Sequence, residues 1–273
     1  MRSRKVGIAR YEDGAFSSRG DELACEEPLE IRVSGDTFAI TMRTPGHDRE
    51  LALGLLFAEG VLASVDDVAT VTHCGRTGDP GRENTIDVRP VSTAKIILPD
   101  ELAASFARRG TLITSACGVC GRKSIDDLLA RCTPLPPGEP LSADAILRAV
   151  GSIKDAQELF TLTGGCHGAR ITTFAGELVA AFEDVGRHNA VDKVIGAMML
   201  AKKLPLAGHI LTVSGRASFE LVQKAAVSGI PVLASVSAPS TLAVELAQRA
   251  NVTLAGFVRG SAMNVYAGVE RIK

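Results

Sequence analysis

The last third of the chain alternates short apolar runs with segments of helical periodicity. The apolar runs cover residues 210–213, 232–236 and 253–258, and the helical segments cover residues 218–227 and 241–250. Short continuous apolar runs are typical of strands that are buried on both faces of a parallel sheet. Strands that alternate with helices in this way are joined by right-handed crossovers. The pattern therefore predicts an α/β domain built on a mixed, largely parallel sheet.

The segment before this alternation adds further elements to the same domain. A helix is expected over residues 142–160, with Ser142 as its N-cap. Residues 170–174 and 177–182 are predicted to form paired strands. Residues 189–203 are predicted to be helical, because apolar side chains recur there at i, i+3, i+4 and i+7.

The first hundred residues have the mixed pattern of an α+β domain. Residues 29–33 and 37–43 alternate like half-buried strands, and the turn residues between them predict a hairpin. A helix is expected after Gly46, where apolar side chains return with helical spacing. A further strand is expected over residues 84–91 and a short helix over residues 101–109.

A proline-rich segment, residues 134–140, separates these two patterns. Each proline lacks a backbone N–H and restricts the residue before it, so the segment cannot hold a helix or a central strand. We therefore predict an N-terminal α+β domain over residues 1–110, a cysteine-bearing loop and linker over residues 111–140, and a C-terminal α/β domain over residues 141–273. A chain of 273 residues can bury a core without disulfides or metals.

The composition argues against several classes of partner. Thirty basic and 31 acidic residues leave a net charge of −1, so no global field attracts nucleic acid or anionic lipid. There is no tryptophan, which leaves few rings on which bases could stack. The basic N-terminus is not followed by an apolar region, and no apolar run reaches 18 residues. We expect a cytoplasmic protein whose six cysteines stay reduced.

Small, polar and cationic residues follow the three apolar runs of the C-terminal third. The first run leads into Ser214, Gly215 and Arg216, the second into Ser237, and the third into Arg259. In an open α/β sheet, ligands bind beyond the carboxyl ends of the strands, and helix N-termini there favour phosphate. Such residues are also common in ordinary loops. Three similar turns in register nevertheless predict a pocket for an anionic, nucleotide-like ligand.

A dense polar segment, residues 183–193, lies where a predicted strand meets a predicted helix. Two interpretations fit it equally well. It is either the capped and exposed start of a helix, with Asn189 or the preceding turn as the cap, or a network that positions a ligand. A glycine-rich turn further upstream carries Cys166 and His167, for which local packing is the favoured interpretation.

Cys117 and Cys120 form a Cys-x-x-Cys loop flanked by glycine and by basic residues. Nearby cations stabilise thiolate, which is the nucleophile in sulfur chemistry. A structural zinc site would need further ligands from Cys132, Cys166 or His167. A thioredoxin-like dithiol would need a βαβ context that the sequence does not show here. The third interpretation is a carrier whose thiolate accepts sulfur from another protein's persulfide.

The signature of zinc-dependent nucleobase deaminases is missing. Those enzymes pair His-x-Glu with Pro-Cys-x-x-Cys. Here Ala116 precedes Cys117, and none of the five histidines is followed two positions later by glutamate. Deaminase chemistry is therefore rejected.

Seven segments together resemble the FdhD family, the sulfurtransferases required for formate dehydrogenase activity. The matching segments are residues 42–46 (Met-Arg-Thr-Pro-Gly), 117–121 (Cys-Gly-Val-Cys-Gly), 163–167 (Thr-Gly-Gly-Cys-His), 183–193, 214–216 (Ser-Gly-Arg), 237–239 (Ser-Ala-Pro) and 256–260 (Gly-Phe-Val-Arg-Gly). The resemblance spans nearly the whole chain. It implies a C-terminal domain similar in fold to cytidine deaminases but without their zinc site, and a homodimer.

The resemblance also implies a function. The protein would take sulfur from a cysteine desulfurase and deliver it to the molybdenum or tungsten bis(molybdopterin guanine dinucleotide) cofactor that formate dehydrogenase receives. Cys117 would bear the persulfide and Cys120 would assist or resolve it, with no permanently bound metal. Ala116 departs from the small hydroxyl residue of many relatives, and we expect a modest change in thiol hydrogen bonding.

The guanine-nucleotide ends of the cofactor are expected in the strand-end pocket, with residues 257–262 closing it and Arg259 facing phosphate. Free guanine nucleotides would act as ligand analogues. The expected binding residues are Arg187, His188, Ser214, Gly215, Arg216, Ser237, Phe257, Val258, Arg259, Gly260, Ser261 and Ala262. The alternative is a non-catalytic chaperone that holds the cofactor and uses its cysteines only for structure or for zinc.

Overall fold

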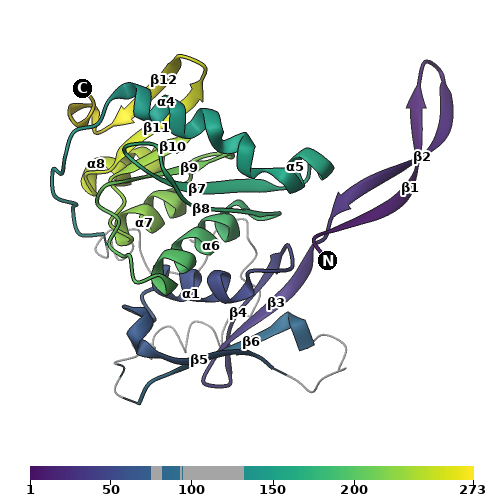
Figure 1. Cartoon of the computed structure of the whole chain (residues 1–273), viewed down its shortest axis with the longest axis horizontal. Coiled ribbons are helices and arrows are strands. Elements are labelled where there is room, and N and C mark those ends of the chain that lie inside the picture. Colours follow the sequence, from purple (N-terminus) through teal and green to yellow (C-terminus); the bar gives the residue numbers. More distant parts are fainter. Residues whose placement is uncertain (75–81, 93, 95–131) are drawn as a thin grey trace.

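A computed structural model describes residues 1–74, 82–92, 94 and 132–273. Its parts are a six-stranded sheet with helices on both faces, a four-stranded sheet against which α1 packs, and a two-stranded hairpin that projects from the body (Figure 1). The helix expected over residues 101–109 lies outside the described residues, as do Cys117 and Cys120.

The six-stranded sheet has the strand order β12-β11-β10-β9-β7-β8. Its strands are β7 (His167–Thr173), β8 (Leu178–Asp184), β9 (His209–Val213), β10 (Val232–Ser235), β11 (Thr253–Arg259) and β12 (Ala262–Ala267). β10 is parallel to β9 and β11, and β7 is antiparallel to both β8 and β9. β8, β9, β10 and β11 therefore run in one direction, which confirms the predicted mixed sheet. Of its five strand pairs, however, only β9–β10 and β10–β11 are parallel.

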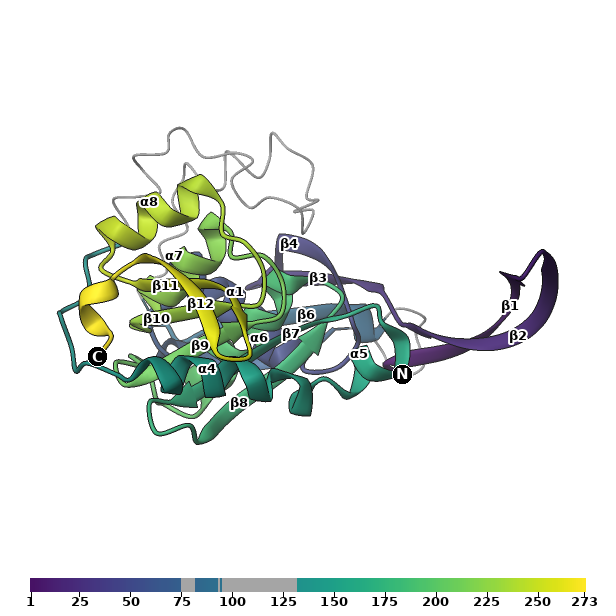
Figure 2. The same cartoon turned by 90° about the horizontal axis from the view of Figure 1, so that it is seen from above.

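Helices cover both faces of this sheet. The helices that connect the parallel strands are α6 (Arg187–Leu200), α7 (Phe219–Val227) and α8 (Thr241–Arg249), and they lie on one face (Figures 1 and 2). α4 (Ala143–Gly151) lies on the other face. Successive side chains of a strand point to opposite faces. Leu211 accordingly joins the core formed with α6 and α7, whereas its neighbour Ile210 packs with α4.

The four-stranded sheet has the order β4-β3-β6-β5. Its strands are β3 (Glu27–Val33), β4 (Asp36–Arg43), β5 (Val68–His73) and β6 (Thr85–Pro90). β3 and β4 form the predicted hairpin through Ser34 and Gly35, whose φ angles of 56° and 94° suit a type I′ turn. α1 (Asp48–Ala58) covers this sheet and buries Leu56 in the same core as Ile31.

Helices α1 and α6 cross in close contact and join the two sheets into one body. A Cβ atom on Gly54 would lie 1.9 Å from the carbonyl oxygen of Asp192, and one on Gly196 would lie 1.9 Å from that of Glu50. These positions are compatible only with glycine, which has no Cβ atom.

The described part of the proline-rich segment has no helix or strand, as predicted. It is nevertheless held against the C-terminal domain. Leu135 N–H donates to the carbonyl of Ala250, and the Arg271 guanidinium donates to the carbonyl of Pro137 at 3.1 Å. The proposed domain boundaries at residues 110 and 140 stay predictions.

The helix predicted over residues 142–160 is wrong in its length, although Ser142 does cap its start by accepting from Ala145 N–H. The helix ends at Gly151, and a 3₁₀ turn (Ser152–Ala156) and α5 (Glu158–Thr163) follow. Ser152 Oγ donates to the carbonyl of Arg148, which favours the break, because such local bonds compete with helical ones. α5 then begins where its backbone finds an acceptor on another strand, the carboxylate of Glu183.

The sequence pattern does not predict strands β1 (Ser3–Glu12), β2 (Ala15–Ala24), β5 and β12. β11 extends to Arg259, one residue beyond its predicted end, and β12 begins at Ala262. The segment expected to close the pocket, residues 257–262, therefore consists of two strand ends with Gly260 and Ser261 in the turn between them. The N-terminal hairpin of β1 and β2 is also unexpected, because glycine and charged residues blur its alternation. Among the described residues, no helix has the length and apolar character needed to cross a membrane.

Candidate functional site

The carboxyl ends of β8, β9, β10 and β11 meet at one edge of the six-stranded sheet, which we call the strand-end edge. α6, α7 and α8 begin there, and so does the antiparallel β7, whose first residue is His167. All predicted binding residues other than the two cysteines lie on this edge: Arg187, His188, Ser214, Gly215, Arg216, Ser237, Phe257, Val258, Arg259, Gly260, Ser261 and Ala262. The fold thus brings together four separate sequence segments.

Hydrogen bonds tie these strand ends to one another. Gly168 N–H donates to Ser214 Oγ at 2.9 Å, and Ser235 Oγ donates to the carbonyl of Gly215 at 2.6 Å. Phe257 N–H donates to the carbonyl of Ser237 at 3.2 Å. The polar atoms of these serines therefore hold the backbone of the edge in place.

The outer surface of the edge carries an exposed ring and two exposed cations. The Phe257 side chain is 45% exposed, and its φ of 51° is a left-handed value that bulky residues rarely adopt. The register of β11 against β12 shifts between Gly256 and Arg259, so this conformation is part of a β-bulge. Arg216 and Arg259 are exposed. Strained, exposed residues of this kind concentrate at ligand sites.

The starts of two helices add positive potential to the edge. The N-cap residues are Gly186 for α6 and Ser218 for α7. Within the described part of the chain, neither N-cap side chain accepts a hydrogen bond from the helix that follows it. By contrast, Ser240 caps α8 by accepting from Ala243 N–H. Uncapped N–H groups and the helix dipole favour an anion. Together with the exposed cations Arg216 and Arg259, they make this edge suitable for an anionic ligand.

His167 lies at the centre of this edge although its sequence context favoured local packing. A Cβ atom on Gly215 would come within 3.1 Å of His167 Nδ1 and 3.6 Å of Arg187 Cδ, so a side chain there would displace the imidazole. Burial, and then the positive charges of Arg187 and His188, lower the pKa of His167 below its ordinary value. Burial and the Arg187 guanidinium therefore favour the neutral form of this imidazole.

The side of α6 that carries His188 and Asp192 packs against α7. His188 Nε2 lies 2.8 Å from Glu220 Oε2 and 3.1 Å from Ser218 Oγ. Ser218 and Glu220 both contact Nε2 of His188. A Ser-His-acid triad instead uses both ring nitrogens, one for the serine and one for the acid, so these three residues do not have its arrangement. His188 is instead placed to hold the start of α7.

One helical turn further along α6, Asp192 forms a buried ion pair with Lys224. Burial raises the pKa of Asp192 to about 6, because Lys224 offsets only part of the cost of desolvating the carboxylate. Burial would lower the pKa of Lys224, but Asp192 and Glu220 raise it on balance. This pair fixes the packing of α6 on α7 below the strand-end edge.

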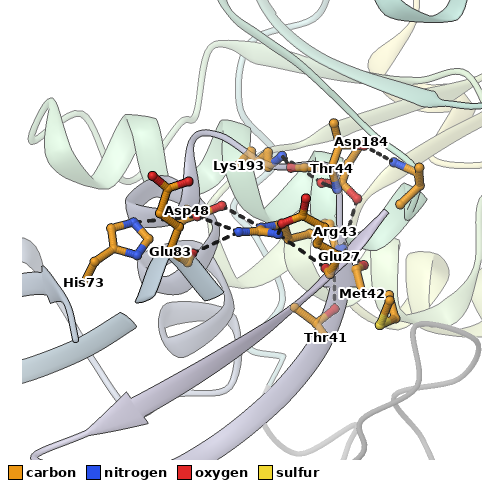
Figure 3. A network of polar contacts seen from close by, with 12 residues as sticks. Glu27, Thr41, Met42, Arg43, Thr44, Asp48, His73, Glu83, Asp184 and Lys193 are labelled. Carbon is orange, nitrogen blue, oxygen red and sulfur yellow. Dashed lines mark hydrogen bonds and ion pairs between the residues drawn. The ribbon is translucent and has the colours of Figure 1, made fainter. Parts of the chain in front are cut away.

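The side of α6 that carries Lys193 faces the loop after β4 (Figure 3). We call the cluster of Thr44, Asp184, Asn189 and Lys193 the junction. Lys193 Nζ lies 2.7 Å from Asp184 Oδ2 and donates to the carbonyl of Thr44 at 3.0 Å. Asp184 also accepts from the backbone N–H of Thr44 and from Asn189 Nδ2. Asp184 is 0% exposed and Lys193 is 1% exposed. This buried cluster locks the N-terminal sheet to α6.

An arginine extends the same network into the N-terminal sheet (Figure 3). Arg43 forms a two-point ion pair with Asp48, with Nε–Oδ1 at 3.0 Å and Nη2–Oδ2 at 3.1 Å. Its guanidinium also donates to the backbone carbonyls of Glu27 and Glu83. His73 Nε2 lies 3.6 Å from Asp48 Oδ2. Arg43 thereby holds the end of β4, the start of α1 and the sheet in one arrangement.

These contacts bear on both interpretations of residues 183–193. The exposed helix start is wrong, because Asp184, Asn189, Asp192 and Lys193 are buried, and the cap lies in the preceding turn at Gly186. The buried charges form a network with other residues of the chain, and the positioning of a ligand by this network stays a prediction. Sequence reasoning missed the partners of this network, since Thr44 is 140 residues from Asp184 and 149 from Lys193.

The Cys-x-x-Cys loop lies outside the described residues, so its three interpretations are not decided by geometry. Among the residues with described positions, no group of three or more His, Cys, Asp and Glu side chains is placed to hold a metal ion. Cys132 and Cys166 are buried thiols. Burial raises the pKa of Cys166, which keeps this thiol protonated and poorly nucleophilic.

Comparison with known proteins identifies the family. The sequence profile of the FdhD/NarQ family matches residues 24–273. The chain belongs to the FdhD/NarQ family. That profile covers both sheets, the junction and the strand-end edge, and leaves most of the β1–β2 hairpin outside it.

Several relatives match this chain over almost their full length. A sulfur carrier protein FdhD from Anaeromyxobacter dehalogenans is 53% identical over 92% of this chain and 88% of its own. Proteins with the same description from Streptomyces avermitilis and Mycobacterium tuberculosis are 49% and 46% identical, over 97% and 93% of this chain and 94% and 93% of theirs. The crystal structure of a putative formate dehydrogenase accessory protein from Desulfotalea psychrophila matches all of both chains with a TM-score of 0.77 at 24% identity, which supports the fold.

Proposed function

We propose that this protein is a sulfur carrier that accepts sulfur on its Cys-x-x-Cys loop and delivers it to a bound nucleotide-bearing metal cofactor. The observation that carries this proposal is the description of relatives as sulfur carrier proteins at 46–53% identity over more than 90% of this chain. This chain has the cysteine pair that such chemistry needs, Cys117 and Cys120. The recipient enzyme would be a formate dehydrogenase, in line with the description of the structural neighbour.

The first step is an exchange at sulfur. The Cys117 thiolate attacks the terminal sulfur of a persulfide on a cysteine desulfurase, the S–S bond of the donor breaks, and the donor cysteine leaves as a thiolate. Cys117 then carries the persulfide. Cys117 and Cys120 lie between Arg109 and Arg122, and nearby cations favour the thiolate form on which the attack depends.

The second step releases the sulfur. The Cys120 thiolate attacks the inner sulfur of the Cys117 persulfide, a Cys117–Cys120 disulfide forms, and sulfide leaves for the metal of the cofactor. Atoms and electrons balance, because the two cysteines supply the two electrons that reduce the sulfane sulfur to sulfide. A cellular dithiol must then reduce the disulfide before the next cycle.

The cofactor is the substrate of this reaction, a molybdenum or tungsten bis(molybdopterin guanine dinucleotide). The strand-end edge is proposed to bind its guanine-nucleotide ends. Arg216, Arg259 and the starts of α6 and α7 suit the diphosphate, and the exposed ring of Phe257 suits the base. A nucleotide that binds here would be held by the body while the cysteine loop reacts with the metal end.

Mass spectrometry tests the transfer. The protein is incubated with a cysteine desulfurase and cysteine, and the intact mass is measured with and without a reducing agent. We expect an increment of one sulfur that a reductant removes and that is lost in Cys117→Ala. In Cys120→Ala the persulfide should form and persist, because its resolving thiol is missing.

The same experiment addresses the alternative, a non-catalytic chaperone with structural or zinc-binding cysteines. A wild-type protein that gains no sulfur while still binding guanine nucleotide would support the chaperone and contradict the carrier. Stoichiometric zinc in the purified protein, lost in Cys117→Ala, would also contradict a carrier role for the loop. The carrier is proposed to act in the cytoplasm as a homodimer without a permanent metal.

A further inference from the structure

The β1–β2 hairpin projects from the body as a separate arm (Figures 1 and 2). Its two strands of ten residues pair without a register shift and are joined by a tight turn, in which Asp13 and Gly14 have φ angles of 54° and 84°. Tyr11 and Phe16 stack near its tip and are 63% and 76% exposed. A two-stranded hairpin alone is marginally stable in water. A further contact is needed to explain why this arm is so long and regular.

The outer edge of β1 is the open side of this arm. Among the described residues, β1 pairs with β2 and with no other strand. β1 has no proline and no bulge, which are two of the devices that block a strand edge. It does carry a third device, charged side chains, at Arg4, Lys5, Arg10 and Glu12, so a partner strand must have complementary charges. The base of β2, in contrast, lies near α5, where a Cβ atom on Gly165 would contact Ala24 Cβ at 3.5 Å. An added strand therefore has free access along β1.

The hydrogen-bonding pattern shows which groups of β1 point outward. Cys25 N–H donates to the carbonyl of Arg2 at 2.8 Å, so this residue pair is a hydrogen-bonded one. Hydrogen-bonded and non-hydrogen-bonded pairs alternate along an antiparallel ladder. Even-numbered residues of β1 thus bond to β2. The residues whose N–H and C=O groups point away from β2 are Ser3, Lys5, Gly7, Ala9 and Tyr11.

We propose that this edge pairs with β1 of a second copy of the chain, antiparallel and about a two-fold axis at Ile8. The two hairpins then form one four-stranded sheet, which has enough strands to be stable. Ile8 faces Ile8 of the second copy in a non-hydrogen-bonded pair, and the outward groups of Gly7 bond to those of Ala9. The contact is self-complementary, as a two-fold interface must be.

The charge pattern of β1 selects this axis. With the axis at Ile8, Arg4 lies opposite Glu12 of the second copy, and the same pair forms twice. Within its own hairpin Glu12 also forms ion pairs with Arg10 and Arg19, so Arg4 would join an existing charge cluster. Moving the axis to Gly7 would place Arg4 opposite Arg10, which is a like-charge pair. Moving it to Ala9 would place Glu12 opposite Val6. The axis at Ile8 combines opposite charges at both ends of the ladder with an apolar centre, and it sets no like charges opposite each other.

The two faces of the joined sheet support the same arrangement. On one face, Val6 and Ile8 of both copies form a single apolar cluster, because diagonal neighbours across two strands are within reach of each other. On the other face, Lys5 lies opposite Tyr11 of the second copy, so that its ammonium group can lie on the exposed ring. Pairing thus covers apolar side chains that one copy leaves in water.

A cysteine at the axis tests the proposal directly. Ile8→Cys places two thiols opposite each other in a non-hydrogen-bonded pair, about 4.5 Å apart at Cα, which is within the range of a disulfide. Mild oxidation of the full-length variant should give a covalent dimer, and peptide mass mapping should find residue 8 linked to residue 8. The wild type reports any links made by the native cysteines.

The matched control is Ser17→Cys, on the same face of the hairpin but on β2. In the proposed sheet two copies of residue 17 are separated by three strand spacings, about 14 Å across the sheet, and by a further four residues along the strands, which is too far for a disulfide. We expect no link at residue 17. A link at residue 17 but not at residue 8, or a dimer in which Ile8→Cys does not react, would overturn the assignment of this edge.

Charge reversal gives an independent test by sedimentation. Arg4→Glu sets glutamate opposite Glu12 at both ends of the ladder, and we expect the dimer to dissociate about tenfold more readily. Glu12→Arg should have the same effect, and the double variant Arg4→Glu/Glu12→Arg should restore the wild-type dissociation constant within about threefold. A wild type that sediments as a monomer at micromolar concentrations, or a double variant no better than the single ones, would overturn the proposal.

Discussion

Helix α6 separates two polar regions that use the same kinds of side chain in different ways. At the junction, Asp184 and Lys193 are almost fully buried, and each meets several groups of the chain itself. At the strand-end edge, Arg216 and Arg259 are exposed, and Phe257 holds a strained backbone with its ring half in water. Charges that are paired inside the protein hold the fold together, whereas charges left at its surface are available to a ligand.

The junction should lose far more stability than the edge when a charge is removed. Lys193→Met leaves Asp184 buried without its cation, and breaking a buried ion pair in this way costs about 3–5 kcal/mol. Urea denaturation followed by circular dichroism measures the loss. Arg259→Ala is the matched control, since an exposed substitution should change the free energy of unfolding by less than about 0.5 kcal/mol. Equal losses in the two variants would remove the distinction between the regions.

The helix crossing beside the junction should be nearly as sensitive. Gly196→Ala forces a methyl group to within 1.9 Å of the Glu50 carbonyl oxygen unless α1 and α6 move apart. We expect a loss of roughly 2–3 kcal/mol in the free energy of unfolding, as for other overpacked sites. Gly208→Ala is the control, because nothing lies within 4 Å of the position that its Cβ atom would take. An unchanged free energy of unfolding in Gly196→Ala would contradict this expectation, because it would mean that α1 and α6 can move apart at little energetic cost.

The strand-end edge should respond in ligand binding rather than in stability. Arg259→Ala removes a charge-assisted contact to phosphate, and calorimetry with GDP should show roughly tenfold weaker affinity, about 1.4 kcal/mol. Arg249→Ala is the control, because Arg249 is exposed at the far end of α8, away from this edge. Unchanged GDP affinity in Arg259→Ala would mean that the nucleotide binds elsewhere.

The smallest expected effect is the lowered pKa of His167. Burial and its cationic neighbours lower its pKa, so nuclear magnetic resonance should find this imidazole still neutral where an exposed histidine is half protonated. Because the folded pKa lies below the unfolded one, the stability that His167 contributes is present above pH 6.5. It is lost as the pH falls below 6.5 and through the lower pKa of the folded state. A pKa at or above 6.5 would contradict the buried, cation-flanked position.

Local sequence patterns predicted the elements but not all of their partners. The alternation in the C-terminal third predicted the parallel strands and therefore the meeting of Ser214, Ser237 and Arg259 at one edge, because parallel order alone brings their ends together. The junction could not be predicted in this way. Lys193 and Thr44 meet only because α1 and α6 cross, and no local pattern reports a contact across 149 residues.

Two failures have a cause that is visible only in the folded chain, namely contacts between segments that are distant in sequence. α4 was expected to continue to residue 160, but α5 starts anew because the Glu183 carboxylate binds its first N–H groups from a distant strand. His167 was assigned to local packing because a single histidine carries little signal. His167 lies beside Gly215 because β7 pairs with β9. This pairing brings together two segments that are far apart in the sequence.

One measurement tests the proposed carrier and its docking edge together. The protein is loaded with radioactive persulfide sulfur by a cysteine desulfurase, mixed with the cofactor, and assayed for label on each partner. We expect Arg259→Ala to load as fully as the wild type but to deliver label to the cofactor at about one tenth of the rate when the cofactor is limiting. Delivery at the wild-type rate by Arg259→Ala would contradict the account, because sulfur would then reach the cofactor without the strand-end edge.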